Sequence, residues 1–186
     1  MDWLFSITEL TQTEFWIVTG LCLFAGIVRG FSGFALSAMV MATAVAILPP
    51  VELIPVLWWL EMSASILMLK NGWQGADKTM TYGLVIGSVI GWPIGLMLTL
   101  SLPVVASKTL ALIVIVGLAA TLLAKVRMSF LATKAGLYGS GILAGTISGI
   151  ASVGGMVVAI YVLAADAPAK TMRASLVLYL LSLIHI

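Results

Sequence analysis

A single arginine inside an apolar stretch is the residue that points most directly to chemistry. Arg29 lies in the segment 26–34 (GIVRGFSGF). At the centre of a membrane-spanning helix an arginine costs about 2.5–3.5 kcal/mol, so such side chains normally face protein or a water-filled cavity. Gly30 and Gly33 leave backbone amides uncovered, and Ser32 adds a hydroxyl group. With the partial positive charge of a helix N-terminus, these groups predict an anion-binding site. A purely structural ion pair, or a side chain that extends to the membrane interface, is the alternative for Arg29.

Glu61 is the second charged candidate. It lies near the centre of another apolar stretch and shares one helical face with Trp58, Met62 and Ser65. A carboxyl group in that position could bind and release a proton during transport. A static ion pair with Arg29, or a permanently neutral carboxyl group, is the alternative, and the sequence leaves the choice open.

A second cluster repeats the first without its arginine. The segment 145–155 (GTISGIASVGG) offers hydroxyl groups and uncovered amides near a glycine-rich break, and its candidate ligands are Ser148, Gly149, Ser152, Gly154 and Gly155. A further glycine series, Gly83 to Gly95 at every fourth position, is typical of close helix packing. Only one cysteine and one histidine occur, so no metal site, cofactor or catalytic nucleophile–base pair is predicted, and the chain is not expected to be an enzyme.

The composition explains what must surround these residues. Hydrophobic residues make up 62% of the 186 positions and charged residues 9%, against roughly a quarter in soluble domains. Mean hydropathy is +1.20. A folded sphere of this size cannot bury so much apolar surface, so the solvent must be lipid. Soluble enzymes, nucleic-acid binders and disordered linkers are thereby excluded.

Three segments, 51–69, 80–100 and 109–124, have about the length that a helix needs to cross ~30 Å of hydrocarbon. The segment 15–48 differs, because a single helix of its 34 residues would be about 51 Å long. Its glycine-rich middle predicts two helices, each shorter than about 20 residues, that meet at a break. The segment 135–165 repeats this pattern.

The two broken segments are predicted to be copies of each other. A shift of 119 positions pairs seven identical residues, with glycines coinciding at the break (Gly26 with Gly145) and prolines at the exit (Pro49 with Pro168). The chain therefore divides into a first repeat at about 15–130 and an incomplete second repeat at about 135–180. Both belong to one transmembrane domain, 15–180.

The positive-inside rule gives the expected topology. If each broken segment returns to the face from which it entered, seven of the nine basic residues lie inside: Lys70, Lys78, Lys125, Arg127, Lys134, Lys170 and Arg173. Residues 1–14, which carry no basic residue, then form an extracytoplasmic segment. Three full crossings between the broken segments make the two repeats inverted, as in many secondary transporters. The predicted fold is thus an all-α, polytopic membrane helix bundle with two inverted repeats.

The end of the sequence suggests a fragment. The second repeat stops within an apolar run, and residues 181–186 (LSLIHI) look like a translated sequencing adapter. His185 is then not a functional candidate. A natural short C-terminus is the alternative.

The segments around both breaks resemble the sulfite exporter TauE/SafE family of membrane permeases. The resemblance rests on 25–34, 49–55, 90–95 and 152–161, with 171–175 following, and extends over most of 15–180. It implies two repeated halves that carry small sulfur-containing anions, such as sulfite or organosulfonates, across the bacterial inner membrane. By position, Arg173 matches the arginine that follows the second motif of the family. Met156 departs from the pattern, because a proline often stands there.

The sequence thus predicts a multi-pass secondary transporter for a small oxyanion, with Arg29 and the amides as ligands and Glu61 as a proton carrier. The expected partners are the lipid bilayer and a small anionic solute, with a homo-oligomer left open. One alternative is a cation or metabolite carrier in which Glu61 binds the solute. The other is a non-transporting membrane assembly subunit whose glycines pack against partner helices.

Overall fold

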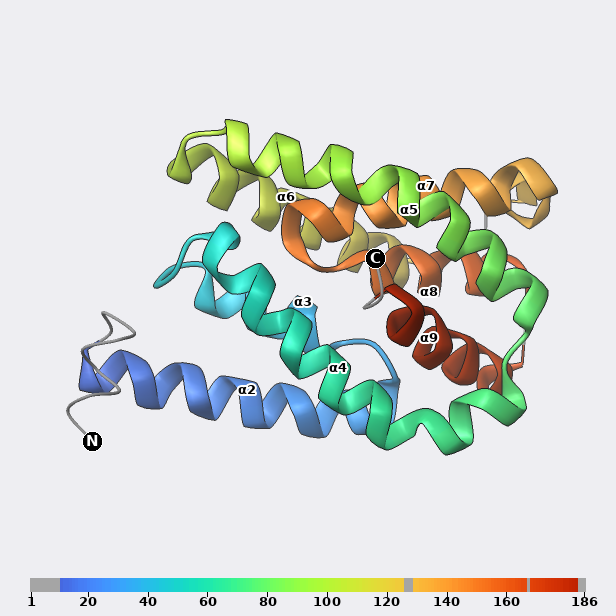
Figure 1. The fold of residues 1–186 in the computed structure, drawn as a ribbon, viewed down its shortest axis with the longest axis horizontal. Coiled ribbons are helices and arrows are strands. Elements are labelled where there is room, and N and C mark those ends of the chain that lie inside the picture. Colours follow the sequence, from blue (N-terminus) through green and yellow to red (C-terminus); the bar gives the residue numbers. More distant parts are fainter. Residues whose placement is uncertain (1–10, 126–128, 167, 184–186) are drawn as a thin grey trace.

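The chain is helical throughout the part that the computed structural model describes, residues 11–125, 129–166 and 168–183 (Figure 1). These ranges contain eight α-helices, one short 3-10 helix and no strand. The elements are α2 (Gln12–Ser32), α3 (Leu36–Ala44), α4 (Pro50–Gly75), α5 (Lys78–Ser101), α6 (Val104–Leu123), η1 (Ser129–Ala132), α7 (Lys134–Ala151), α8 (Gly154–Ala164) and α9 (Ala169–Leu183). The predicted all-α class is confirmed, whereas the expectations for residues 1–10, Arg127 and His185 fall outside the described ranges.

Four helices are long and apolar enough to cross a membrane: α2, the Pro50–Leu69 part of α4, α5 and α6. The predicted crossings 51–69, 80–100 and 109–124 coincide with α4, α5 and α6. Helix α6 begins five residues earlier than predicted because Pro103 serves as its N-cap, so Lys108 falls inside the helix. The ammonium group of Lys108 donates to the carbonyl oxygen of Ala46 at 3.3 Å. These helices identify a membrane protein.

The prediction that the segment 15–48 forms two helices, each shorter than about 20 residues, is wrong for its first helix. Helix α2 has 21 residues, enough to cross a membrane by itself, and α3 has only nine. Helix α2 begins before the apolar run because Thr11 and Glu14 form a capping box at its N-terminus. Gly30 remains helical, and the helix ends only at Gly33, whose φ of 87° lies in the left-handed region that glycine adopts readily.

Helices α5 and α7 pack closely along their glycines (Figure 1). A Cβ atom added at Gly145 would lie only 2.6 Å from Cα of Ser88 and 2.9 Å from the backbone nitrogen of Trp92. One added at Gly87 would lie 2.6 Å from the carbonyl oxygen of Tyr138. The predicted packing role of the glycines of α5 is therefore confirmed, since only glycine permits this backbone approach.

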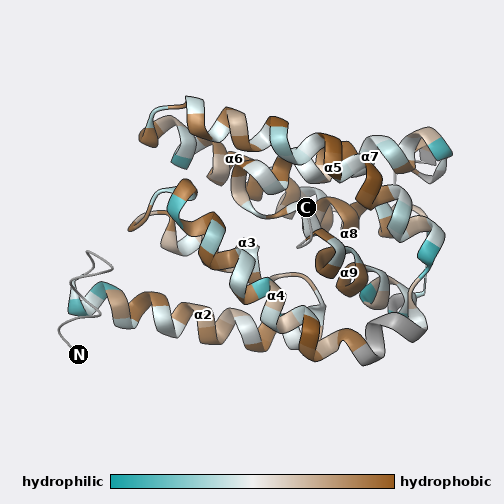
Figure 2. Ribbon diagram, viewed as in Figure 1, coloured by the Kyte–Doolittle hydropathy of each residue, from teal (hydrophilic) through white to brown (hydrophobic). Residues whose placement is uncertain are grey.

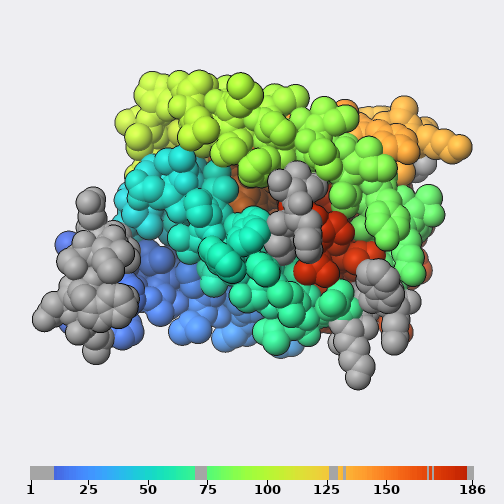
Figure 3. All heavy atoms as spheres, viewed as in Figure 1, coloured from blue at the N-terminus to red at the C-terminus, as the bar shows by residue number. Residues whose placement is uncertain are grey.

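Helix α2 is the least covered of the four candidate crossings, with 11% of its window buried. Figure 2 shows hydrophobic residues along its length, and Phe31, Leu23 and Ile27 are exposed. Helix α4 lies between α2 and the α5–α6 pair on the face drawn in Figure 3. Helix α4 packs against α9 and provides the charged partner of Arg29 at the site described next.

Candidate functional site

A buried ion pair joins α2 to α4. Arg29 lies in the last turn of α2, and its side chain is fully buried. Its Nη1 atom lies 2.6 Å from Oε2 of Glu61, which is 5% exposed. The ion pair that the sequence left as an alternative is therefore present, and it neutralises two charges that would each be costly to bury alone.

The end of α2 supplies Arg29 with a further partner. Because Gly33 turns the chain out of the helix, its carbonyl oxygen faces back and accepts from Nη1 of Arg29 at 3.2 Å. On α4, Oγ of Ser65 accepts from Nη2 at 2.8 Å. Both Gly33 and Ser65 are buried, so the guanidinium group is held on two sides by residues of different helices.

The carboxylate of Glu61 is held by the first turn of α3. Its Oε1 atom accepts from the hydroxyl group of Ser37 at 2.6 Å and from the Ser37 backbone nitrogen at 3.3 Å. A carboxylate at a helix N-terminus is stabilised by the helix dipole. Helices α2, α3 and α4 are thus joined through one charged cluster.

The remaining predicted residues of the first break have different surroundings. The hydroxyl group of Ser32 accepts from the backbone nitrogens of Phe34 and Ala35, at 3.4 and 3.3 Å. Two of the amides that the sequence offered to an anion are therefore already satisfied within the chain. Gly30 is exposed, and a Cβ atom added there would have nothing within 4 Å.

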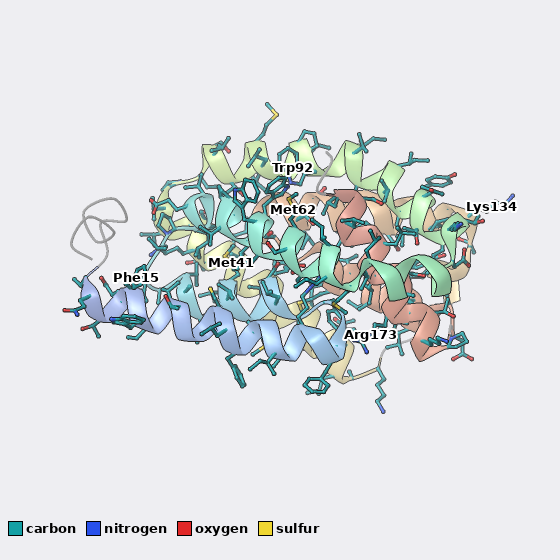
Figure 4. All side chains as sticks on the ribbon, turned by 60° about the horizontal axis from the view of Figure 1, so that its bottom comes forward. Phe15, Met41, Met62, Trp92, Lys134 and Arg173 are labelled. Atoms are coloured by element: carbon teal, nitrogen blue, oxygen red, sulfur yellow. The ribbon has the colours of Figure 1, made fainter. Side chains whose placement is uncertain are left out.

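Arg173 reaches the same break from α9. Its Nη2 atom donates to the carbonyl of Gly30. Its side chain covers Gly33 so closely that an added Cβ atom would lie 2.9 Å from Cγ of Arg173. Figure 4 shows Arg173 beside the C-terminal end of α2. The structure thus brings Glu61 and Arg173 to the segment of Arg29, Gly30 and Gly33, although both are far from it in the sequence.

The predicted residues of the second break form a separate, uncharged group. Ser148 is buried on α7, and the buried hydroxyl groups of Ser88 and Tyr179 form a hydrogen bond at 2.8 Å nearby. Gly149 packs against the backbone of α5, and Gly154 packs against Ser148. Ser152 caps α7 with φ 57°, and its amide donates to the carbonyl of Ser148 at 2.8 Å.

The two groups approach each other at Gly155. A Cβ atom added there would lie 3.6 Å from Cβ of Phe34, which follows the first break, and 3.6 Å from the side chain of Leu180 on α9. The sequence reasoning placed Ser65 on the face of Glu61 but did not identify Ser37, Ser88 or Tyr179 as site residues. These three are brought in by helix packing, which no local pattern in the sequence specifies.

Within the described ranges, no three His, Cys, Asp or Glu side chains are placed so that they could hold a metal ion. No family model, curated protein or solved structure matches the chain. The resemblance to the TauE/SafE family therefore remains a prediction from the motifs, and the case for a function rests on the charged cluster at the end of α2.

Proposed function

We propose that the chain is a secondary membrane transporter, or permease, for small sulfur-containing anions such as sulfite or organosulfonates. The observation that carries the proposal is the fully buried Arg29 at the end of an apolar helix, with Arg173 at the same break. Two arginines at one place in the fold suit an oxyanion, because guanidinium groups bind such anions through charge and paired hydrogen bonds.

The helix ends support two inverted repeats with broken helices. The shift of 119 positions that aligns the glycines also relates Gly33, the C-cap of α2, to Ser152, the C-cap of α7, and both residues have positive φ. It further relates Pro49, the N-cap of α4, to Pro168, which directly precedes α9. Transporters with such repeats bind their solutes where the broken helices meet.

The proposed setting is the bacterial inner membrane, with the chain crossing several times. The first repeat, about 15–130, and the incomplete second repeat, about 135–180, make up one transporter domain. The second group contributes Ser148, Gly149, Ser152, Gly154 and Gly155 to the same solute path, because Gly155 lies beside Phe34 of the first break.

Glu61 is the proposed proton carrier. Its carboxylate pairs directly with Arg29, so any change in its protonation alters the charge available to an anion at that arginine. Protonation of Glu61 removes the negative charge that neutralises Arg29 and so favours binding of an anion there, which couples anion flux to a proton gradient.

A flux assay tests the proposal. The purified chain is placed in liposomes, and entry of sulfite is followed with and without a pH gradient. The expected result is sulfite entry that Arg29→Lys abolishes, since lysine retains the charge for Glu61 but not the forked donor geometry. Unchanged entry in Arg29→Lys would remove Arg29 from the mechanism, and a lack of any anion movement would count against the transporter class.

The charged cluster also supports a second candidate, a cation or metabolite carrier in which Glu61 binds the solute. The observation in its favour is that Ser37 and Arg29 hold the carboxylate buried at a defined position. Glu61→Gln separates the two candidates. It should abolish cation binding under the second proposal, whereas under the first it should mainly uncouple anion flux from the pH gradient.

A further inference from the structure

The three nitrogen atoms of the Arg29 guanidinium group differ in how many partners they contact. Nη1 contacts the Glu61 carboxylate at 2.6 Å and the Gly33 carbonyl at 3.2 Å. Nη2 donates to Oγ of Ser65 at 2.8 Å. Nε is buried and has no hydrogen-bond partner in the described part of the chain. The charged partner and the backbone partner thus lie at Nη1, and the Nε–Nη2 edge meets only one neutral hydroxyl group.

That edge has the donors that an oxyanion needs. A guanidinium group binds two oxygens of one anion through two parallel N–H bonds, and neighbouring nitrogens such as Nε and Nη2 provide that geometry. Buried donors without a partner are rare in native proteins, so an unpaired Nε calls for an explanation. Ser65 accepts from Nη2 here, which leaves its own hydroxyl hydrogen to donate to a ligand.

The charges around the break also favour an anion. Arg29 and Arg173 both hydrogen-bond to backbone carbonyls between positions 30 and 33, and Glu61 supplies one negative charge. Two arginines and one glutamate leave one positive charge in excess, which a monovalent anion would balance. A cation bound there would increase the imbalance.

We propose that the Nε–Nη2 edge of Arg29, together with the hydroxyl group of Ser65, binds one oxyanion group of the transported solute. Glu61 holds the guanidinium group from the opposite side, at Nη1. The inference rests on the proposed anion transport, and it adds Ser65 to the binding residues. The ligand class is a small anion that presents at least two oxygens sharing one charge, as a sulfonate group does.

Calorimetric titration of the full chain in detergent micelles tests the assignment. The probe is methanesulfonate, the anion of a strong acid, so its charge does not vary with the buffer. Ser65→Ala should weaken binding about tenfold or more, as expected for the loss of a hydrogen bond to a charged ligand. Ser65→Thr keeps the hydroxyl group and should retain binding.

Ser63→Ala is the matched control, because Ser63 lies on the same helix, is exposed and donates only to the Trp59 carbonyl at 2.9 Å. It should change the Kd less than about twofold. Arg29→Lys should abolish binding while thermal unfolding shows a folded chain, since lysine lacks an Nε donor beside a second nitrogen.

The outcomes separate the two levels of the proposal. If the unmodified chain does not bind methanesulfonate, the anion transport and the assignment of the edge both fail. If it binds and Arg29→Lys abolishes binding, but Ser65→Ala and Ser63→Ala bind equally well, anion binding at Arg29, on which the transport proposal rests, stands and Ser65 is wrongly assigned. If Arg29→Lys binds as tightly as the unmodified chain, the Nε–Nη2 edge is not the contact.

Discussion

The two glycine-rich segments carry different chemistry at positions that the proposed repeat relates. By the shift of 119 positions, Arg29 corresponds to Ser148 and Glu61 corresponds to Leu180. The first segment therefore holds a buried ion pair, and the second lies beside the hydrogen-bonded hydroxyl groups of Ser88 and Tyr179. Helices α2 and α7 both end on a residue with positive φ, so similar backbone turns accompany a charged cluster at one helix end and a neutral one at the other.

The same pair of regions differs in how its glycines are covered. Gly145 and Gly149 on α7 lie against the backbone of α5, whereas Gly26 and Gly30 on α2 have nothing within 4 Å of an added Cβ atom. Of the glycines that the proposed repeat relates, only those on α7 serve close packing. The difference shows that a glycine pattern alone does not reveal which helix face is covered.

The largest predicted effect on stability comes from replacing Arg29 with serine, the residue that the shift of 119 positions aligns with it. Arg29→Ser leaves the Glu61 carboxylate buried without its cation, and this should lower the free energy of unfolding by about 3–5 kcal/mol. Adding Glu61→Leu should recover most of the loss, because the unpaired charge is removed as well. Unfolding in a denaturing detergent series measures both variants. If the double variant is less stable than Arg29→Ser alone, the stability losses add, and Arg29 and Glu61 are not coupled.

Gly145→Leu tests the difference in packing. The new side chain meets the α5 backbone and should destabilise the chain by about 1–3 kcal/mol. The matched variant Gly26→Leu places the same side chain at the equivalent position of α2, where it should change stability by less than about 0.5 kcal/mol. Thermal unfolding compares the two. Equal losses would mean that α2 is covered as closely as α7.

Tyr179→Phe removes the hydroxyl group that forms a hydrogen bond with Ser88. A loss of about 0.5–1.5 kcal/mol in the free energy of unfolding is expected, since the buried hydroxyl group of Ser88 loses a partner. Tyr82→Phe is the control because Tyr82 is 52% exposed, and it should have little effect. If the Tyr179 hydroxyl group does not stabilise the fold, Tyr179→Phe and Tyr82→Phe will have the same free energy of unfolding.

The smallest effect concerns the C-cap of α7. Ser152 has φ 57°, which glycine adopts with less strain, so Ser152→Gly should raise the free energy of unfolding by about 0.5 kcal/mol. Ser152→Ala keeps the strain and should give no gain. A chemical denaturation series with narrow steps resolves the difference, and a gain in Ser152→Ala would place its origin elsewhere.

Hydropathy predicted three of the four candidate crossings, α4, α5 and α6, because segment length and composition suffice for that task, whereas α2 was expected to be one half of a hairpin. Helices α4 and α5 begin and end close to the predicted limits, apart from the extension of α4 beyond residue 69. The length of α2 was less predictable, since Gly26 and Gly30 read as breakers but stay helical. In an apolar helix no water competes for the backbone hydrogen bonds, so a glycine alone does not end it.

The site was predictable only in part. Arg29 and Glu61 stand out because charges are rare in the sequence, and their pairing was among the alternatives. Ser37 meets Glu61 from another helix, and Tyr179 meets Ser88 across 91 positions. Contacts of this kind depend on how helices pack, which hydropathy and spacing do not encode.

The central claim is that anion transport requires the charged cluster of Arg29 and Glu61. Uptake of labelled sulfite into liposomes, measured in parallel for the unmodified chain and for the double variant Arg29→Ser with Glu61→Leu, tests it most directly. The predicted result is uptake by the unmodified chain and none by the variant, with both chains folded. Equal uptake by a folded variant would contradict the account.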